Sequence, residues 1–160
     1  MRSFVAVLLI VFASGLHAQE LELALPFWAT QSWKALAAKS GLRISKRLNP
    51  YVWRGDFDGD GRADLAVFVE SISSKKQGIA FLLQGKRPLL IGAGIDFENG
   101  GDDFAWVNFW HVEDRGTKHG NYVRQSVTLK ADGLMIAEKG SASALVYMRN
   151  GRLQWRQYGD

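Results

Sequence analysis

The chain has 160 residues, of which 47% are hydrophobic and 22% are charged, and its formal net charge is +4. These values are ordinary for a water-soluble globular protein of one domain, and the length is sufficient to bury a core without covalent cross-links. Cysteine is absent, which excludes disulfide bonds, thiolate metal sites and a cysteine nucleophile.

The N-terminal segment has the layout of a secretory signal peptide. Its first three residues give a short positive start, an apolar run covers 4–12, and small residues follow up to Ala18. The run is shorter than the roughly 20 residues that a permanent transmembrane helix needs, although an N-terminal membrane anchor is the alternative. We expect removal of residues 1–18, a single mature domain over 19–160, and a periplasmic or secreted location without a permanent membrane span.

The basic residues are scattered through the sequence in pairs such as Lys75-Lys76 and Lys86-Arg87. This distribution is typical of a solubilising surface, and no basic stripe is formed. For an exported protein, an anionic polymer of the cell envelope is a better candidate partner than nucleic acid, which we do not expect.

One helix is expected, over 26–40. A proline suits its first turn, Trp33, Leu36 and Ala37 share one face at helical spacing, and Gly41 is a natural stop.

From residue 52 onward, short β-rich runs alternate with turn residues. Strands are expected over 52–56, 64–72, 78–84, 88–92, 104–112, 122–130, 133–138, 143–149 and 153–158. The pairs Asp132-Gly133 and Asn150-Gly151 predict two tight hairpins between apolar strands. The predicted fold class is mainly β (α+β), an antiparallel meander or sandwich-like sheet with one N-terminal helix.

The expected strand 104–112 is apolar on both of its alternating faces, and it contains Trp106 and Trp110. Such a strand is usually central and covered on both sides, so that its aromatic residues belong to the core. The alternative is an open aromatic platform for a sugar or a peptide, since tryptophan offers a large contact area at little cost in entropy.

The most informative segment joins the first two expected strands. Counted from Asp56, it has aspartates at positions 1, 3, 5 and 9 and a glycine at position 6. These residues are Asp56, Asp58, Asp60, Gly61 and Asp64. Calcium prefers six to eight oxygen ligands, and alternate aspartates of a curled loop can supply several of them. The glycine permits a sharp turn, which would direct the backbone carbonyl of Arg62 at the ion.

Four carboxylates in so short a loop repel one another, and Arg54 and Arg62 offset only part of that charge. The sequence therefore predicts a calcium ion at this loop, with a solvated Asp-Gly turn as the alternative. An EF-hand is excluded, because position 12 is Val67 in place of glutamate and the flanking segments are expected strands.

The stretch Gly-Asp-Phe-Asp-Gly-Asp-Gly-Arg-Ala-Asp-Leu-Ala-Val resembles the calcium loop of FG-GAP and VCBS-type repeats, over roughly residues 52–70. The resemblance implies a calcium-binding loop between two antiparallel strands, with ligands from Asp56, Asp58, Asp60, the backbone of Arg62, and Asp64. A propeller needs several copies, and this chain has one, so a full propeller is not expected. The layout also resembles small bacterial exported proteins that combine one such loop with a C-terminal hairpin.

A second acidic segment, 96–103, lacks the alternation of the first and is expected to be a plain loop, although it could contribute an extra ligand to the same ion, or Asp102 and Asp103 could line a binding cleft. No zinc motif, serine elbow or phosphate loop is present. Three hypotheses follow. The first is a non-catalytic, exported calcium-binding domain. The second is a periplasmic binding or inhibitor protein that recognises a cell-envelope polymer, a hydrolase or a toxin. The third is a hydrolase that uses the 96–103 loop with His111.

Overall fold

The computed structural model describes residues 25–119 and 127–159. The signal peptide expected over 1–18 and most of the strand expected over 122–130 lie outside the described residues. In chain order the elements are α2 (Phe27–Ser40), β1 (Leu42–Ile44), β2 (Val52–Gly55), β3 (Asp64–Ser71), β4 (Gln77–Leu82), β5 (Leu89–Gly92), the 3-10 helix η1 (Glu98–Gly100), β6 (Phe109–Glu113), β7 (Lys118–His119), β8 (Val127–Thr128), β9 (Gly133–Ala137), β10 (Ser143–Arg149) and β11 (Arg152–Gly159).

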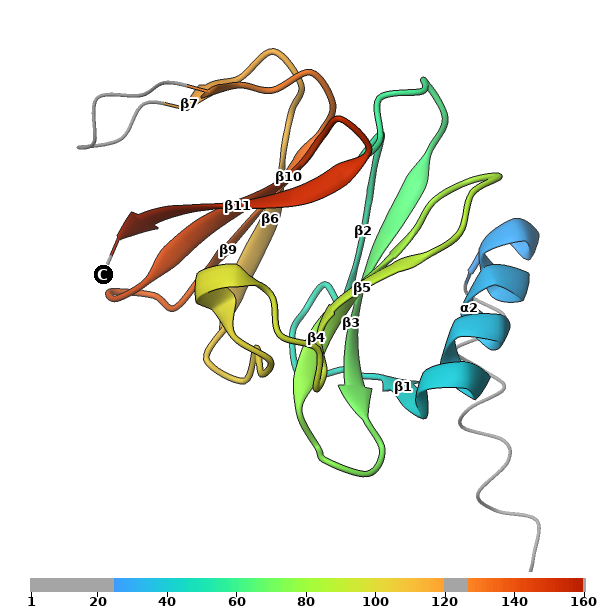
Figure 1. The fold of residues 1–160 in the computed structure, drawn as a ribbon. Helices are drawn as coiled ribbons and strands as arrows, with labels where there is room; N and C mark the ends of the chain where they lie inside the picture. The colour runs from blue at the N-terminus through green and yellow to red at the C-terminus, as the bar shows by residue number, and fades with distance from the viewer. Residues whose placement is uncertain (1–24, 120–126, 160) are drawn as a thin grey trace, which may run out of the picture.

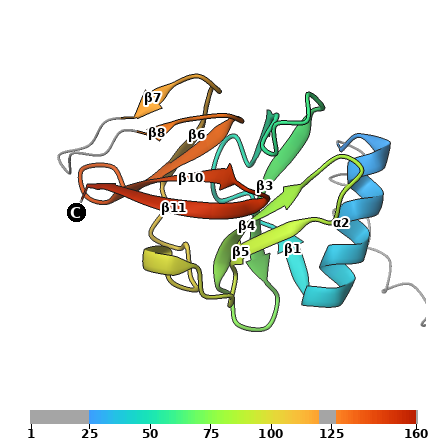
Figure 2. The same cartoon turned by 45° about the horizontal axis from the view of Figure 1, so that its top comes forward.

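Two antiparallel sheets form the body of the molecule (Figure 1). In the first sheet, β3 lies between β4 and the pair β1 and β2, and β5 forms the far edge beside β4. The second sheet has the order β11-β10-β9-β6. A short ribbon of β7 and β8 extends from the side of the second sheet that faces away from α2 (Figure 2).

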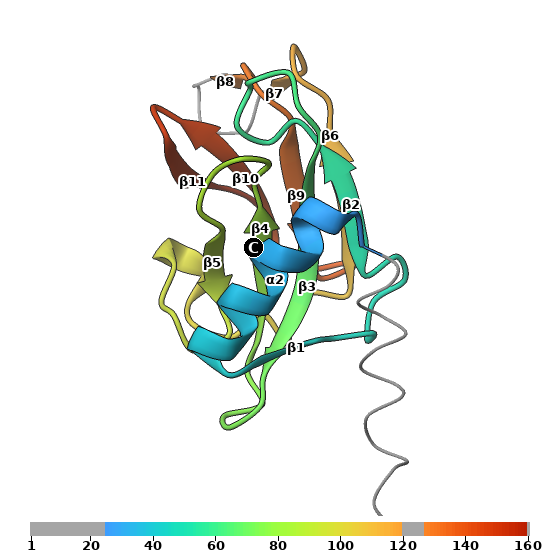
Figure 3. The ribbon, with the colours of Figure 1, turned by 90° about the vertical axis from the view of Figure 1, so that its right-hand side faces the viewer.

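The molecule has three layers, with the first sheet between α2 and the second sheet (Figures 1 and 3). Alternate residues of β3 explain this arrangement: Leu65, Val67 and Val69 pack in the cluster with Ala29 and Trp33 of the helix, whereas the residues between them face the second sheet. The second core cluster lies between the sheets and is made of Leu48, Phe57, Ala66, Phe68, Ile79, Phe81, Leu83, Ile91, Phe104, Val107, Trp110, Leu134, Ile136, Ala144 and Val146. Burial on both faces is why β3 and β4 read as continuous apolar runs.

The mainly β, sandwich-like fold class with one helix is confirmed. The helix begins after Pro26, whose carbonyl accepts the N–H of Thr30 at 2.9 Å, and it ends at Gly41 with φ of 61° in the left-handed region. The hairpin at Asn150-Gly151 is also confirmed, because both residues have positive φ and Arg149 pairs with Arg152 across the turn. Within the described residues, no helix is long and apolar enough to cross a membrane.

The strand expected over 104–112 is shorter and differently placed. Only Phe109–Glu113 is extended, as β6 at an edge of the second sheet. Phe104, Val107 and Trp110 are the buried residues. Burial of every third residue is typical of a turn, and the N–H of Val107 donates to the carbonyl of Phe104 at 3.1 Å. The apolar pattern on both faces therefore came from a buried turn and a short edge strand.

The hairpin expected at Asp132-Gly133 is wrong. Before it, β8 pairs with β7, whereas after it β9 pairs with β6 and β10. The Asp-Gly pair is instead a connection whose aspartate bonds to other parts of the chain, as described below.

Candidate metal centre

The loop that carries the aspartates joins β2 to β3, and the pair Gly55 and Asp64 closes it at the base. We refer to residues 56–64 as the aspartate loop. Its shape has two local causes. Gly59 and Gly61 have φ of 77° and 84°, a region that side chains other than glycine rarely adopt. Phe57 is 1% exposed and packs edge-on against Phe81 with ring centroids 5.3 Å apart, which anchors the loop in the core between the sheets.

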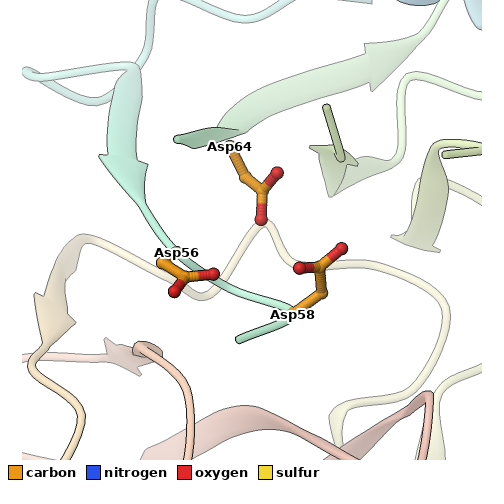
Figure 4. Close-up of side chains that lie close together, drawn as sticks. All are labelled: Asp56, Asp58 and Asp64. Atoms are coloured by element: carbon orange, nitrogen blue, oxygen red, sulfur yellow. The ribbon is translucent and has the colours of Figure 1, made fainter. Parts of the chain in front are cut away.

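Three carboxylates of the loop point toward a common centre (Figure 4). One oxygen from each of Asp56, Asp58 and Asp64 lies within 4.8 Å of the others. This spacing fits one ion with calcium–oxygen distances of about 2.3–2.6 Å, because two ligands on opposite sides of it are then about 5 Å apart. The alternation of aspartates in the sequence thus produces the convergence that was expected for these three residues.

Asp60 and Arg62 lie at the outer end of the loop. Both residues are exposed, and the N–H of Arg62 donates to Oδ1 of Asp60 at 2.9 Å. This hydrogen bond is the main cause that lowers the pKa of Asp60. Asp60 is outside the group of three converging carboxylates.

Backbone N–H groups hold the carboxylates in position. Asp56 accepts from Gly59 at 2.8 Å through Oδ1 and from Gly61 at 3.0 Å through Oδ2. Asp64 accepts from Phe57 at 3.0 Å and from Gln84 at 2.8 Å. Such bonds stabilise charged carboxylates, so part of the negative charge is already compensated by the backbone.

Asp64 is the most deeply placed ligand candidate. It is 0% exposed, and desolvation, with a further contribution from the charge of Asp58, raises its pKa to about 6. A buried carboxylate is costly unless a cation or hydrogen bonds offset the loss of water. A divalent ion among the three aspartates would supply that compensation.

Two basic side chains that the sequence does not connect with the loop lie beside it. Nζ of Lys86, in the turn between β4 and β5, is 2.7 Å from Asp58 Oδ2 and 3.2 Å from Asp60 Oδ2. Nη1 of Arg115 is 3.5 Å from Asp56 Oδ2. The expectation that only Arg54 and Arg62 oppose the loop's charge is therefore incomplete, because the chain provides an internal ammonium group.

Asp132 links the aspartate loop to the second sheet. Its Oδ2 accepts the N–H of Asp56 at 2.6 Å and its Oδ1 accepts the N–H of Arg115 at 3.0 Å. Its own N–H donates to the carbonyl of Asp56 at 2.8 Å. From the sequence, Asp132 was expected only to form a turn. It lies far from Asp56 along the chain, so no local pattern predicted their contact.

The second acidic segment has a structural role in this molecule. Asp102 forms an ion pair with Lys76. Asp103 Oδ1 accepts the N–H groups of Gln77 at 2.8 Å and Ala105 at 3.0 Å. Both carboxylates therefore attach the 96–103 segment to the start of β4, at a distance from the aspartate loop.

The aromatic residues of segment 104–110 belong mostly to the core. Trp110 is 3% exposed, and its Nε1 donates to the carbonyl of Pro50 at 2.7 Å. Trp106 is half-buried and packs against Phe104 and Trp155, with ring centroids 6.2 Å from each. Trp110 is thus unavailable as a binding surface, and the two tryptophans do not form an open platform.

His111 lies on the face of β6 opposite to Trp110, since neighbouring strand residues point to opposite faces. Its Nε2 is 2.7 Å from Oε1 of Glu113. Asp102 and Asp103 are bonded at the start of β4, and within the described residues neither carboxylate is bonded to His111.

Comparison of the chain with protein-family models, curated proteins and solved structures gave no match.

Proposed function

We propose that this chain is a non-catalytic, exported domain that binds one calcium ion in the aspartate loop. The single observation that carries the proposal is the convergence of Asp56, Asp58 and Asp64 on one point, with Asp64 fully buried. Asp60 and the backbone carbonyl of Arg62, which lie at the outer end of the loop, would complete the proposed ligand set after that end closes on the ion, together with water.

Calcium is the ion that best suits this group of ligands. The candidate ligands are all oxygen atoms, which favours a hard cation over zinc or copper. Magnesium demands a near-ideal octahedron at shorter distances and retains several waters, whereas calcium accepts irregular sets of carboxylates. The position of the loop between two strands suits a flexible oxygen cage.

The proposed role of the ion is to stabilise the junction between the two sheets. The aspartate loop belongs to the first sheet through β2 and β3, and Asp132 bonds the same loop to the segment that leads into β9. An ion in the loop would fix the geometry of Asp56, to which Asp132 is bonded. Binding to the folded state alone raises the free energy of unfolding.

Export is part of the proposal, and it rests on the sequence of residues 1–18. A millimolar or submillimolar dissociation constant, about 10⁻⁴–10⁻³ M, is typical of calcium sites in extracellular modules. Such a site would be filled wherever calcium is at millimolar concentration.

The test is thermal unfolding of the protein in calcium and in chelator. At a calcium concentration of about 100 times the dissociation constant, the ion adds about 2.7 kcal/mol to the free energy of unfolding. For a domain of this size we expect the melting temperature to rise by about 5–10 °C.

The variant Asp58→Ala should lose this calcium-dependent rise. The matched control is Asp96→Ala, which removes an exposed aspartate outside the aspartate loop and should keep the rise. Equal melting temperatures in calcium and in chelator for the wild-type protein would refute a structural ion.

A further inference from the structure

A hollow of about 520 Å³ lies between the aspartate loop and the turn that joins β10 to β11. Its lining includes Asp58 of the loop, Lys130 from the segment before β9, Tyr147 and Arg149 from the end of β10, and Asn150 of the turn. The volume is within the range of about 300–1,000 Å³ that is usual for small-molecule sites. Three segments distant in the sequence thus enclose one space.

The basic side chains of this hollow are unpaired within the described residues. Lys130, Arg149 and Asn150 make no side-chain hydrogen bond or ion pair with the described part of the chain. The carboxylate of Asp58, in contrast, is paired with Lys86. The unpaired charges that line the space are therefore positive.

The turn carries a further cation beside the hollow, although it does not line it. Arg152 lies directly opposite Arg149 in the register of β10 and β11, and both residues are exposed. Like charges directly opposite each other on a β-hairpin are unfavourable. Two guanidinium groups in this position are expected to gain from an anion between them, because guanidinium binds carboxylate through paired hydrogen bonds.

We propose that this hollow binds a carboxylate-bearing saccharide, the chemistry of an acidic polysaccharide segment. Arg149, Arg152 and Lys130 would hold the carboxylate. The carboxamide of Asn150 can donate to one sugar hydroxyl and accept from another, and the ring of Tyr147 offers a flat apolar surface with a polar end. This inference goes beyond the calcium proposal and does not depend on it, because Lys86 already balances the charge of Asp58.

The test is a calorimetric titration of the full chain with a disaccharide of galacturonic acid, in chelator and again in calcium. We expect saturable binding, and binding at least about tenfold weaker for the dimethyl ester of the same disaccharide, because the ester retains the sugar rings and loses the charge. Inorganic phosphate should also bind at least about tenfold more weakly, because it offers no sugar rings or hydroxyls to Tyr147 and Asn150.

The variant Arg149→Gln/Arg152→Gln should weaken binding of the disaccharide by about tenfold or more. The matched control, Lys39→Gln/Arg87→Gln, removes the same charge from exposed positions outside the hollow and should bind like the wild type. Thermal unfolding of both variants establishes that they are folded.

Absence of binding to the wild type, equal binding of the ester, equal binding of phosphate, or full binding by the Arg149→Gln/Arg152→Gln variant would each overturn the proposal. Calcium is titrated separately without saccharide. Failure of calcium to bind counts against the proposed function alone, since the titration in chelator decides the saccharide site.

Discussion

Lys86 bears directly on the charge of the aspartate loop. Its ammonium group lies at hydrogen-bonding distance from Asp58 and Asp60, and these two bonds are the main causes that raise the pKa of Lys86. An ammonium group and a calcium ion at the same carboxylate repel each other. In our account Lys86 is an internal counter-ion that calcium must displace from Asp58.

Replacement of Lys86 by methionine should therefore strengthen calcium binding. The expected gain is about two- to fivefold, because exposed ion pairs are individually weak. Calorimetric titration with calcium measures it, and Arg87→Met in the same turn is the control for the loss of a nearby positive charge. An unchanged or weaker affinity in Lys86→Met would show that Lys86 does not compete with the ion.

Asp64 predicts how the calcium-free protein responds to pH. Burial raises its pKa to about 6, above the usual value of about 3.9. Between these two values the folded state holds a proton that the unfolded state has released, so the free energy of unfolding falls as the pH rises from about 4 to about 6.

The expected loss is at most about 3 kcal/mol, and chemical denaturation at several pH values in chelator measures it. The variant Asp64→Asn has no titratable group at this position. Its free energy of unfolding should therefore not show the fall with rising pH that Asp64 causes. If wild type and variant had parallel pH profiles, the raised pKa of Asp64 would be contradicted.

At the scale of elements, the aspartate loop is held by a connection that no local pattern indicates. Asp132 accepts hydrogen bonds from the N–H groups of Asp56 and Arg115, and thereby joins the hairpin of β2 and β3 to the start of β9. A residue so placed would position Asp56, the first proposed ligand of the loop, without itself contacting the ion.

The variant Asp132→Ala leaves two backbone N–H groups without their acceptor. We expect a loss of about 1–3 kcal/mol in the free energy of unfolding, and weaker calcium binding because Asp56 is less well fixed. Denaturation in chelator measures the first effect and calcium titration the second. Asp114→Ala, at an exposed position nearby, should change neither quantity, and normal calcium affinity in Asp132→Ala would exclude the positioning role.

Elements with a strong local signal were predicted well from the sequence. The helix followed from its apolar spacing and Gly41, and the last hairpin from Asn150-Gly151. The segment 104–112 was misjudged because burial of every third residue in a turn and alternation in a strand cannot be separated when nearly all residues are apolar. The strand β1 was missed because Leu42–Ile44 is too short to show a period.

At the scale of the whole molecule, the sequence predicted the class of fold but left the layers undetermined. The continuous apolar character of Leu65–Val69 is explained only when the helix covers one face of the first sheet and the second sheet covers the other. The carboxylates of the aspartate loop were found from their own spacing. Lys86, Arg115 and Asp132 were not, because the contact of Lys86 depends on the pairing of β3 with β4, and those of Arg115 and Asp132 depend on how the two sheets pack.

The central claim is that the aspartate loop is a calcium site at the junction of the two sheets. A crystal structure of the protein grown in calcium tests it most directly. We predict an ion at about 2.3–2.6 Å from oxygens of Asp56, Asp58 and Asp64, with the ammonium group of Lys86 withdrawn from Asp58. A well-ordered loop without an ion, in which Lys86 still contacts Asp58, would contradict the account.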